Sequence, residues 1–146
     1  MKNKILLDCT FRDGGYYNKW HFDLKLFNEY IKCMNKCKID IIELGFRFSS
    51  KNSFLGNFAY STEDFLNKLV LPKKLKYAVM INAKEFYHKE KSLLKLFKPK
   101  KLSRINIVRI AINFNEFKRS KKIIKILNDL NYEVGLNLMQ AHDRTK

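Results

Sequence analysis

Five short apolar runs recur along the chain and are separated by longer segments with helical spacing. Each run is nearly continuous in Ile, Leu, Val and other apolar residues, as expected for strands that are covered on both faces. We therefore predict five strands, at residues 5–10, 39–46, 75–82, 105–112 and 134–139.

The segments between these runs predict helices. Apolar positions recur at helical spacing after His21, and Asp23 near the start suits the positive end of a helix dipole. A loop rich in Ser, Asn and Gly follows the second strand. Ser61 or Thr62 can then cap the next helix, and Pro72 lies just beyond its end. The predicted helices span residues 21–38, 63–71, 91–97 and 115–130, and the loop spans residues 47–60.

Strand and helix alternate with short connections, which is the order of a parallel sheet with crossover helices. An open doubly wound sheet and a closed eight-stranded barrel share this order. The Gly14-Gly15 pair predicts a tight loop after the first strand, but residues 12–17 lack the GxGxxG spacing of a nucleotide-binding open sheet. Polar residues lie instead at the carboxyl ends of strands, where barrel enzymes place their chemistry. We predict an α/β fold, namely a partial TIM (β/α)8 barrel.

The length of the chain limits how much of a barrel it can form. A complete barrel needs about 250 residues, and the 146 residues here provide about the first five strands with their intervening helices. We expect residues 1–146 to be the N-terminal part of a single barrel domain. Residues 141–146 are polar, start no clear helix and stop abruptly, so we interpret them as a non-native or disordered tail.

The composition of the chain limits the cellular compartments in which we expect the protein. The chain has no run of about eighteen apolar residues, and its N-terminus lacks an apolar leader with a small-residue cleavage site. Three cysteines without a CxxC pair are typical of reduced thiols. We expect a cytoplasmic protein without a membrane segment.

The formal charge of +16 raises the question of nucleic-acid binding. The excess is mostly Lys, is scattered along the chain and accompanies abundant Asn, Ile and Phe, the residues that an A/T-rich coding sequence produces. The two densest lysine runs, at residues 73–76 and 98–101, fall in predicted helix-to-strand loops. A solvated basic surface therefore explains the charge better than a nucleic-acid site.

The strongest local motif is Leu-Asp-Cys-Thr-Phe-Arg-Asp-Gly-Gly at residues 7–15. A carboxylate beside an arginine at the mouth of a parallel strand suits chemistry on an α-keto acid. The carboxylate can hold a divalent cation that polarises the substrate carbonyl, and the guanidinium can stabilise the enolate oxygen as charge develops. An Arg-Asp surface pair in a turn is the alternative that the spacing alone leaves open.

The motif Asp8-x-Thr10-x-Arg12-Asp13-Gly14 resembles the first-strand signature of the metal-dependent lyase and synthase barrels. That superfamily includes HMG-CoA lyase, 4-hydroxy-2-oxovalerate aldolase, and the isopropylmalate and homocitrate synthases. The continuation through residues 14–18 and the Glu-Leu-Gly-Phe-Arg-Phe of residues 43–48 are similar to bacterial aldolase-domain proteins. Residues 107–111 and 137–140 resemble the fourth and fifth strands of the superfamily, so the likeness extends to about residue 140.

The resemblance implies roles for residues on three strands. Asp13 would be a ligand of a divalent metal, Mn²⁺ or Mg²⁺, and Arg12 would steady the enolate. Glu43 would be catalytic, or else ion-paired inside the barrel with Arg109. Arg109 would reach a substrate carboxylate, or else form only that pair.

Two further residues of the motif have supporting roles in this interpretation. Asp8 and Thr10 would orient the Arg12-Asp13 corner by hydrogen bonds, and Thr10 is also a candidate contact of the substrate.

The chain departs from the superfamily pattern in two places. The aldolase branch has a histidine base shortly after Arg-Asp-Gly, whereas this chain has Tyr16, a candidate catalytic stand-in but a poor base at neutral pH. The superfamily also completes its metal site with a His-x-His pair, which this sequence lacks. We expect His21, which would open a helix, His88 and His142 to be surface histidines rather than ligands.

Three hypotheses follow. The first is a fragment or truncated form of a metal-dependent carbon–carbon lyase that acts on a small 2-oxo acid and is inactive alone. An acyl-CoA-dependent synthase of the same superfamily is the alternative enzyme class within this hypothesis. The second is a non-catalytic half-barrel that self-associates or pairs with a complementary half-barrel through its open sheet edge. The third and weakest is a basic nucleic-acid binder.

Overall fold

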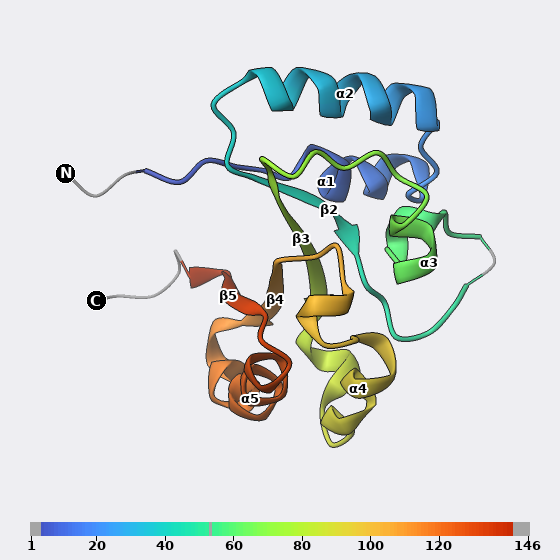
Figure 1. The fold of residues 1–146 in the computed structure, drawn as a ribbon. Coiled ribbons are helices and arrows are strands. Elements are labelled where there is room, and N and C mark those ends of the chain that lie inside the picture. The colour runs from blue at the N-terminus through green and yellow to red at the C-terminus, as the bar shows by residue number, and fades with distance from the viewer. Residues whose placement is uncertain (1–3, 53, 142–146) are drawn as a thin grey trace.

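A single parallel sheet organises the molecule. The computed structural model describes residues 4–52 and 54–141, so the tail that we interpreted at residues 141–146 lies outside them except for its first residue. Five parallel strands lie in the order β1-β2-β3-β4-β5 and curl into a half-barrel, with helices between them (Figure 1). The predicted partial barrel is therefore confirmed. The strands are β1 (Leu7–Asp8), β2 (Ile41–Phe46), β3 (Lys76–Asn82), β4 (Ile107–Asn113) and β5 (Glu133–Met139).

Short helices and 3₁₀ turns connect these strands. The α-helices are α1 (Thr10–Asn18), α2 (Leu24–Lys36), α3 (Glu63–Leu66), α4 (Leu93–Leu96) and α5 (Lys121–Asp129). The 3₁₀ turns are η1 (Asn57–Ala59), η2 (Ala83–Phe86), η3 (Glu90–Ser92), η4 (Lys100–Leu102) and η5 (Phe114–Ser120).

The tight loop that we predicted after the first strand is wrong, because residues 10–18 form helix α1. Neither Gly14 nor Gly15 has a positive φ, so the pair does not serve a turn. Gly15 provides space instead, since a Cβ there would lie 2.0 Å from the indole Nε1 of Trp20. The backbone enters the left-handed region at Lys19, the residue that caps the end of α1, where φ is 57°.

Two predicted helices are shorter than expected. Predicted helix 63–71 ends at Leu66, after which Leu69 N donates to Leu66 O at 3.1 Å in a tightened, 3₁₀-type turn. The first half of predicted helix 115–130 is the 3₁₀ turn η5. There Ser120 Oγ donates to Phe117 O at 2.5 Å and competes with the backbone ladder.

Helix starts agree better with the sequence. Asp23 caps α2, because its Oδ1 accepts hydrogen bonds from Lys25 N at 2.7 Å and Leu26 N at 3.0 Å. His21 therefore precedes this helix instead of opening it. Of the two predicted caps of α3, Thr62 is the cap, and its Oγ1 accepts from Phe65 N at 3.3 Å.

The two faces of the sheet bury different side chains. The large apolar core lies between the sheet and the helices, where Val79 and Ile110 pack with Phe27 and Ile123 in one buried cluster. A small second cluster of Leu7, Ile41, Ala78 and Ile107 lies on the inner face of the half-barrel. Because side chains alternate along a strand, the residues two positions further along β2 and β4 share that inner face. These residues are Glu43 and Arg109.

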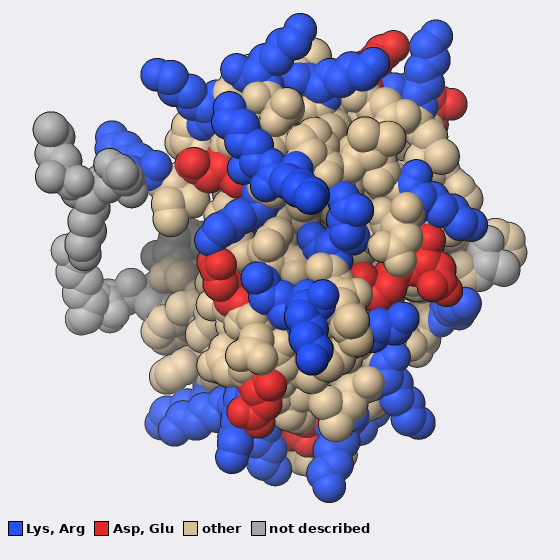
Figure 2. Space-filling model, in the orientation of Figure 1, with Lys and Arg blue, Asp and Glu red and all other residues tan. Residues whose placement is uncertain are grey.

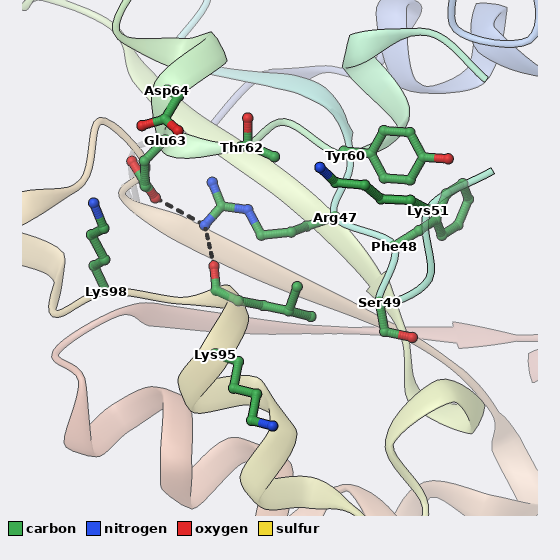
Figure 3. Close-up of a pocket in the computed structure, with 11 residues that line it drawn as sticks. Arg47, Phe48, Ser49, Lys51, Tyr60, Thr62, Glu63, Asp64, Lys95 and Lys98 are labelled. Carbon is green, nitrogen blue, oxygen red and sulfur yellow. Dashed lines mark hydrogen bonds and ion pairs between the residues drawn. The ribbon is translucent and has the colours of Figure 1, made fainter. Parts of the chain in front are cut away.

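A buried ion pair lies in the helical layer. Arg47 and Glu63 meet between the loop after β2 and helices α3 and α4, with side chains that are 2% and 7% exposed (Figure 3). This pair is separate from the inner face.

Basic side chains are spread over the surface. On the face shown in Figure 2, Lys and Arg are distributed widely and interleaved with Asp and Glu, and they do not gather into one stripe. None of the helices in the described part of the chain is long and apolar enough to cross a membrane.

Candidate active site

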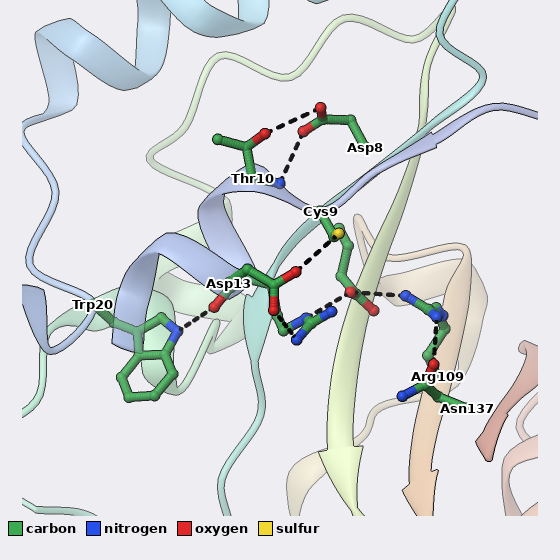
Figure 4. A network of polar contacts seen from close by, with 9 residues as sticks. Asp8, Cys9, Thr10, Asp13, Trp20, Arg109 and Asn137 are labelled. Atoms are coloured by element: carbon green, nitrogen blue, oxygen red, sulfur yellow. Dashed lines mark hydrogen bonds and ion pairs between the residues drawn. The ribbon is translucent and has the colours of Figure 1, made fainter. Parts of the chain in front are cut away.

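The inner face of the half-barrel holds a cluster of charged side chains around Glu43 (Figure 4). Glu43 Oε2 accepts hydrogen bonds from Arg12 Nε and from Arg109 Nη1, both at 2.9 Å. The Glu43 side chain is fully buried, whereas Arg12 is 13% and Arg109 21% exposed. The ion pair that we considered between Glu43 and Arg109 is present, and Arg12 joins the same carboxylate oxygen.

Strand register explains why Glu43 and Arg109 meet. Strand β3 lies between β2 and β4, and its residue level with Glu43 is Ala78, which is in turn level with Ile107. The methyl side chain of Ala78 leaves room for Arg109 to reach across β3. On the other side, Arg109 is paired with Gly135 of β5, where a Cβ would lie 3.4 Å from Arg109 Cγ. On β3, Arg109 itself is level with Met80, so its long side chain extends back to the level of Ala78 to reach Glu43.

Arg12 reaches Glu43 from the first turn of α1. The Asp8 carboxylate accepts hydrogen bonds from Thr10 N at 3.0 Å and from Thr10 Oγ1 at 3.1 Å, which fixes the start of this helix at the end of β1. Tyr30 of α2 donates its hydroxyl to the same carboxylate. The Arg12 carbonyl accepts from Trp20 Nε1 at 3.1 Å. Asp8 and Thr10 thus contact each other at the start of the helix that carries Arg12 and Asp13, and their role in orienting that corner stays a prediction.

Asp13 is held by two neighbours. One of its oxygens accepts from Arg12 Nη1, and the other accepts from Cys9 Sγ at 3.1 Å. Burial raises the pKa of the Cys9 thiol, and the hydrogen bond and charge of Asp13 raise it further. The thiol is therefore a hydrogen-bond donor to Asp13 at neutral pH, and it is not a thiolate.

Electrostatics favour a charged Arg12. Burial by itself lowers the pKa of the guanidinium, but the hydrogen bond and charge of Glu43, with a smaller contribution from Asp13, outweigh burial and raise the pKa overall. The Arg12 guanidinium lies 5.9 Å from the centre of the Phe46 ring. A fixed positive charge in a partly desolvated setting is suited to stabilising a developing negative charge.

The residues present do not form a complete metal site. Within residues 4–52 and 54–141, no group of three or more His, Cys, Asp or Glu side chains could hold a metal ion. Asp13 is 53% exposed and accessible to a cation, but both of its oxygens already accept hydrogen bonds from protein groups. Hard cations require several oxygen or nitrogen ligands at once.

Tyr16 and the histidines are the remaining candidate residues, and most of them are exposed. Tyr16 is 63% exposed, and its ring packs edge-on against Trp20 and Phe46 at 5.0 and 6.0 Å. His21 and His88 are exposed and belong to other parts of the surface. His142 lies outside the described residues.

Sequence reasoning missed three members of the cluster. Arg109 Nη2 donates to Asn137 Oδ1 at 3.0 Å, Cys9 donates to Asp13, and Tyr30 supports Asp8 from another helix. Cys9 and Asn137 fall within the motifs discussed above, so their positions were a usable signal. Tyr30 occupies an apolar position of an amphipathic helix, and nothing in the local pattern marks its hydroxyl.

Comparison with known proteins supports an aldolase-like fold. No protein-family model and no curated protein matches the chain. Among solved structures, the chain is similar to one described as the N-terminal domain of a "putative aldolase" from Bacteroides vulgatus, with 31% sequence identity and a TM-score of 0.78. The match covers 96% of this chain and 46% of that one, so this chain spans a little less than half of its neighbour. The protein therefore has an aldolase-like partial barrel fold.

Proposed function

We propose that this chain carries the part of an aldolase active site that binds a 2-oxo acid and stabilises its enolate. The observation that carries the proposal is the convergence of Arg12 and Arg109 on the buried carboxylate of Glu43. A guanidinium has five N–H donors, and the contacts described above leave donors of both arginines available. The likeness to the Bacteroides vulgatus structure and the first-strand motif support the same class of enzyme.

The proposed reaction is the cleavage of a 4-hydroxy-2-oxo acid. The C4 hydroxyl loses its proton, the C3–C4 bond breaks, an aldehyde leaves, and the electron pair of the broken bond forms the enolate of the shorter 2-oxo acid. Protonation at C3 completes the reaction. In this scheme Arg12 stabilises the enolate oxygen, Arg109 binds the substrate carboxylate, and Glu43 holds both guanidinium groups in place. Tyr16 is our candidate for the proton acceptor.

Metal dependence is part of the proposal, with Asp13 as one ligand of Mn²⁺ or Mg²⁺. Because the described part of the chain offers the ion no group of three or more ligands around Asp13, we expect Mn²⁺ to bind weakly, in about the millimolar range or above. Titration calorimetry should show that Asp13→Asn weakens this binding, whereas Arg12→Ala preserves it. An equal loss of Mn²⁺ affinity in both variants would contradict the separate roles of the two residues.

The binding of an enolate mimic tests the proposed function directly. Oxalate is planar and dianionic like the enolate of a 2-oxo acid, so it should bind the chain saturably in titration calorimetry. Arg12→Lys or Arg109→Lys should weaken binding about tenfold, because lysine cannot reproduce the bidentate geometry of arginine. Arg119→Lys is the matched control, since Arg119 is 61% exposed and lies outside the cluster. If oxalate does not bind, or if the control loses as much affinity, the proposal is wrong.

We expect no useful turnover from the 146-residue chain by itself. Barrel active sites draw residues from several strand ends around the ring, and five strands contribute here. The check is an assay of pyruvate release from a panel of 4-hydroxy-2-oxo acids in the presence of Mn²⁺. Turnover that disappears in Asp13→Asn would show that five strands are sufficient. A panel that includes acyl-CoA thioesters with 2-oxo acids tests the synthase variant of the proposal.

A second candidate function is assembly with another half-barrel. Exposed apolar side chains lie on or beside both edge strands, with Leu136 41% and Leu138 38% exposed on β5, and Ile5 70% and Leu6 49% exposed before β1. Such residues at open strand edges favour pairing with a second copy or with a complementary polypeptide. Size-exclusion chromatography with light scattering should then give a dimer or larger species. A stable monomer at high concentration would contradict self-association.

A further inference from the structure

A cavity lies in the helical layer, away from the Glu43 cluster. Its volume is about 290 Å³, and it is lined by the loop after β2, the segment that begins α3 and the segment that ends α4 (Figure 3). Ligand sites in proteins usually begin at about 300 Å³. The cavity is therefore of the right size for a small organic molecule.

The wall of this cavity contains a buried ion pair with unused hydrogen-bonding capacity. Arg47 Nη1 donates to Glu63 Oε1 at 2.9 Å and to Leu96 O at 3.3 Å, and Nη2 donates to Ser61 O at 2.6 Å. Ser103 Oγ also donates to Glu63 Oε1, at 2.8 Å. Arg47 Nε and Glu63 Oε2 are buried and have no hydrogen-bond partner among the residues that the structure describes.

Unpaired polar atoms of this kind are unusual inside proteins, and each one calls for a physical reason. The Arg47 side chain is 2% and the Glu63 side chain 7% exposed, so bulk water does not satisfy them. A bound molecule with a hydrogen-bond donor for the Glu63 oxygen would satisfy at least one of the two atoms.

The mouth of the cavity is cationic. Exposed Lys51, Lys95 and Lys98 line it, and none of the carboxylates in residues 4–52 and 54–141 forms an ion pair with them. The lining contains four cationic side chains and two carboxylates, Glu63 and Asp64, an excess of two positive charges. In Figure 3 the ammonium group of Lys51 points toward Arg47 and that of Lys98 toward Glu63, whereas Lys95 points away.

We propose that this cavity binds a small hydroxylated anion, with its phosphate or carboxylate group held by Lys51 and Lys98 and a hydroxyl donating to Glu63 Oε2. The lysines supply the charge that attracts the anion, and the unpaired carboxylate oxygen distinguishes a hydroxylated ligand from a bare anion. This site is independent of the proposed 2-oxo acid site, because it shares no residue with the Glu43 cluster.

Titration calorimetry at constant ionic strength tests the site with three probes: glycerol 3-phosphate, glycerate and inorganic sulfate, a bare dianion that carries no hydroxyl at neutral pH. At least one hydroxylated probe should bind saturably and about tenfold more tightly than sulfate. Glycerol 3-phosphate and glycerate then distinguish a phosphate ligand from a carboxylate ligand. If none of the three binds, or if sulfate binds as tightly as the hydroxylated probes, the proposal is overturned.

Two variants with equal charge separate a built site from general attraction of anions. Lys51→Ala/Lys98→Ala should weaken binding of the preferred probe about tenfold or more. Lys25→Ala/Lys36→Ala, which removes two exposed lysines from α2, should leave the affinity unchanged. Equal weakening in both double variants would show that only net charge attracts the anion, and the proposed site would be wrong.

The Glu63→Gln variant tests the contact with the hydroxyl. It should reduce the preference for the hydroxylated probe over sulfate while leaving the affinity for sulfate itself nearly unchanged. A circular dichroism melt of this variant checks that it is folded at the temperature of the titration. An unchanged preference in the folded variant would remove Glu63 from the site.

Discussion

Two arginine–glutamate clusters in this molecule contain the same residue types but bury them to different extents. On the inner face, the carboxylate of Glu43 is fully buried and its two arginines reach solvent, with exposed fractions of 13% and 21%. In the helical layer, Arg47 itself is buried, at 2% exposure, and its guanidinium is surrounded by protein acceptors. Burial is thus concentrated on the acid in the inner cluster, whereas in the helical layer the acid and the base are both buried.

The pKa shifts of the two arginines follow this difference. Burial lowers the pKa of Arg47, and the charge and hydrogen bond of Glu63 do not compensate for it. For Arg12, burial acts in the same direction, but Glu43 and Asp13 outweigh it and the pKa is raised. The comparison separates a partly hydrated, strongly paired arginine, whose pKa is raised, from a deeply buried arginine that holds elements together, whose pKa is lowered.

The largest expected effect is on stability, from breaking the pair in the helical layer. Arg47→Met should lower the free energy of unfolding by about 3–5 kcal/mol, because it leaves the Glu63 carboxylate buried without its counter-charge. The double variant Arg47→Met/Glu63→Leu should recover most of that loss, since it removes both charges. Urea denaturation of the wild type, the single variant and the double variant measures these free energies of unfolding. A single variant as stable as the wild type would contradict the structural role of Arg47.

A smaller loss of stability is expected from Glu43→Gln. This change removes the shared carboxylate and leaves Arg12 and Arg109 facing each other, but both remain partly hydrated, so we expect a loss of about 1–3 kcal/mol. The free energy of oxalate binding should decrease by more than the free energy of unfolding does, because the two guanidinium groups lose the carboxylate that holds both of them in position. If oxalate affinity is unchanged in the folded variant, Glu43 does not position the arginines.

Tyr30→Phe tests the support of the inner cluster by helix α2. Loss of the hydrogen bond to Asp8 should lower the free energy of unfolding by about 1 kcal/mol at neutral pH. In the wild type, burial and then Asp8 raise the pKa of Tyr30.

The sign of the pH effect follows from that raised pKa. The protonated hydroxyl is favoured in the folded state, so its contribution is fully present below the ordinary tyrosine pKa of about 10 and is lost as the pH rises further. Between about pH 10 and the onset of alkaline unfolding, the wild type should therefore lose stability more steeply than Tyr30→Phe. Parallel curves of unfolding free energy against pH would show that the hydroxyl is not held as the structure indicates.

The smallest expected effect is that of Ser103→Ala in the helical layer. Ser103 Oγ donates to a Glu63 oxygen that also accepts from Arg47, so its loss leaves that oxygen with a partner. We expect a change of about 0.5–1 kcal/mol in the free energy of unfolding. A loss as large as that of Arg47→Met would mean that Ser103, and not the ion pair, holds Glu63 in place.

Much of the fold could be predicted from the sequence, since continuous apolar runs indicate strands buried on both faces. All five strands lie within two residues of their predicted bounds, although the first shrinks from six predicted residues to Leu7–Asp8. The error at Gly14-Gly15 arose because glycine can serve a turn or provide space. The need for space was set by Trp20, which packs on Gly15.

The candidate site divides in a similar way. Arg12, Asp13 and Glu43 stand out because charged residues within or beside apolar strands require a reason, and the motif around them is local. Asn137 and Tyr30 join the site only through strand register and helix packing, which bring residues from β5 and α2 to partners far away in the sequence.

The sequence by itself determined the order of strands and helices, because the hydrophobic pattern and the helix caps act over a few residues. It also marked Glu43 and Arg109 as charged residues within apolar strands, with an ion pair inside the barrel as one alternative. Only the tertiary structure decided that two arginines share one oxygen of Glu43, and that a second arginine–glutamate pair is buried in the helical layer. Both arrangements depend on the curl and register of the sheet, which arise from contacts between distant segments and which no local pattern contains.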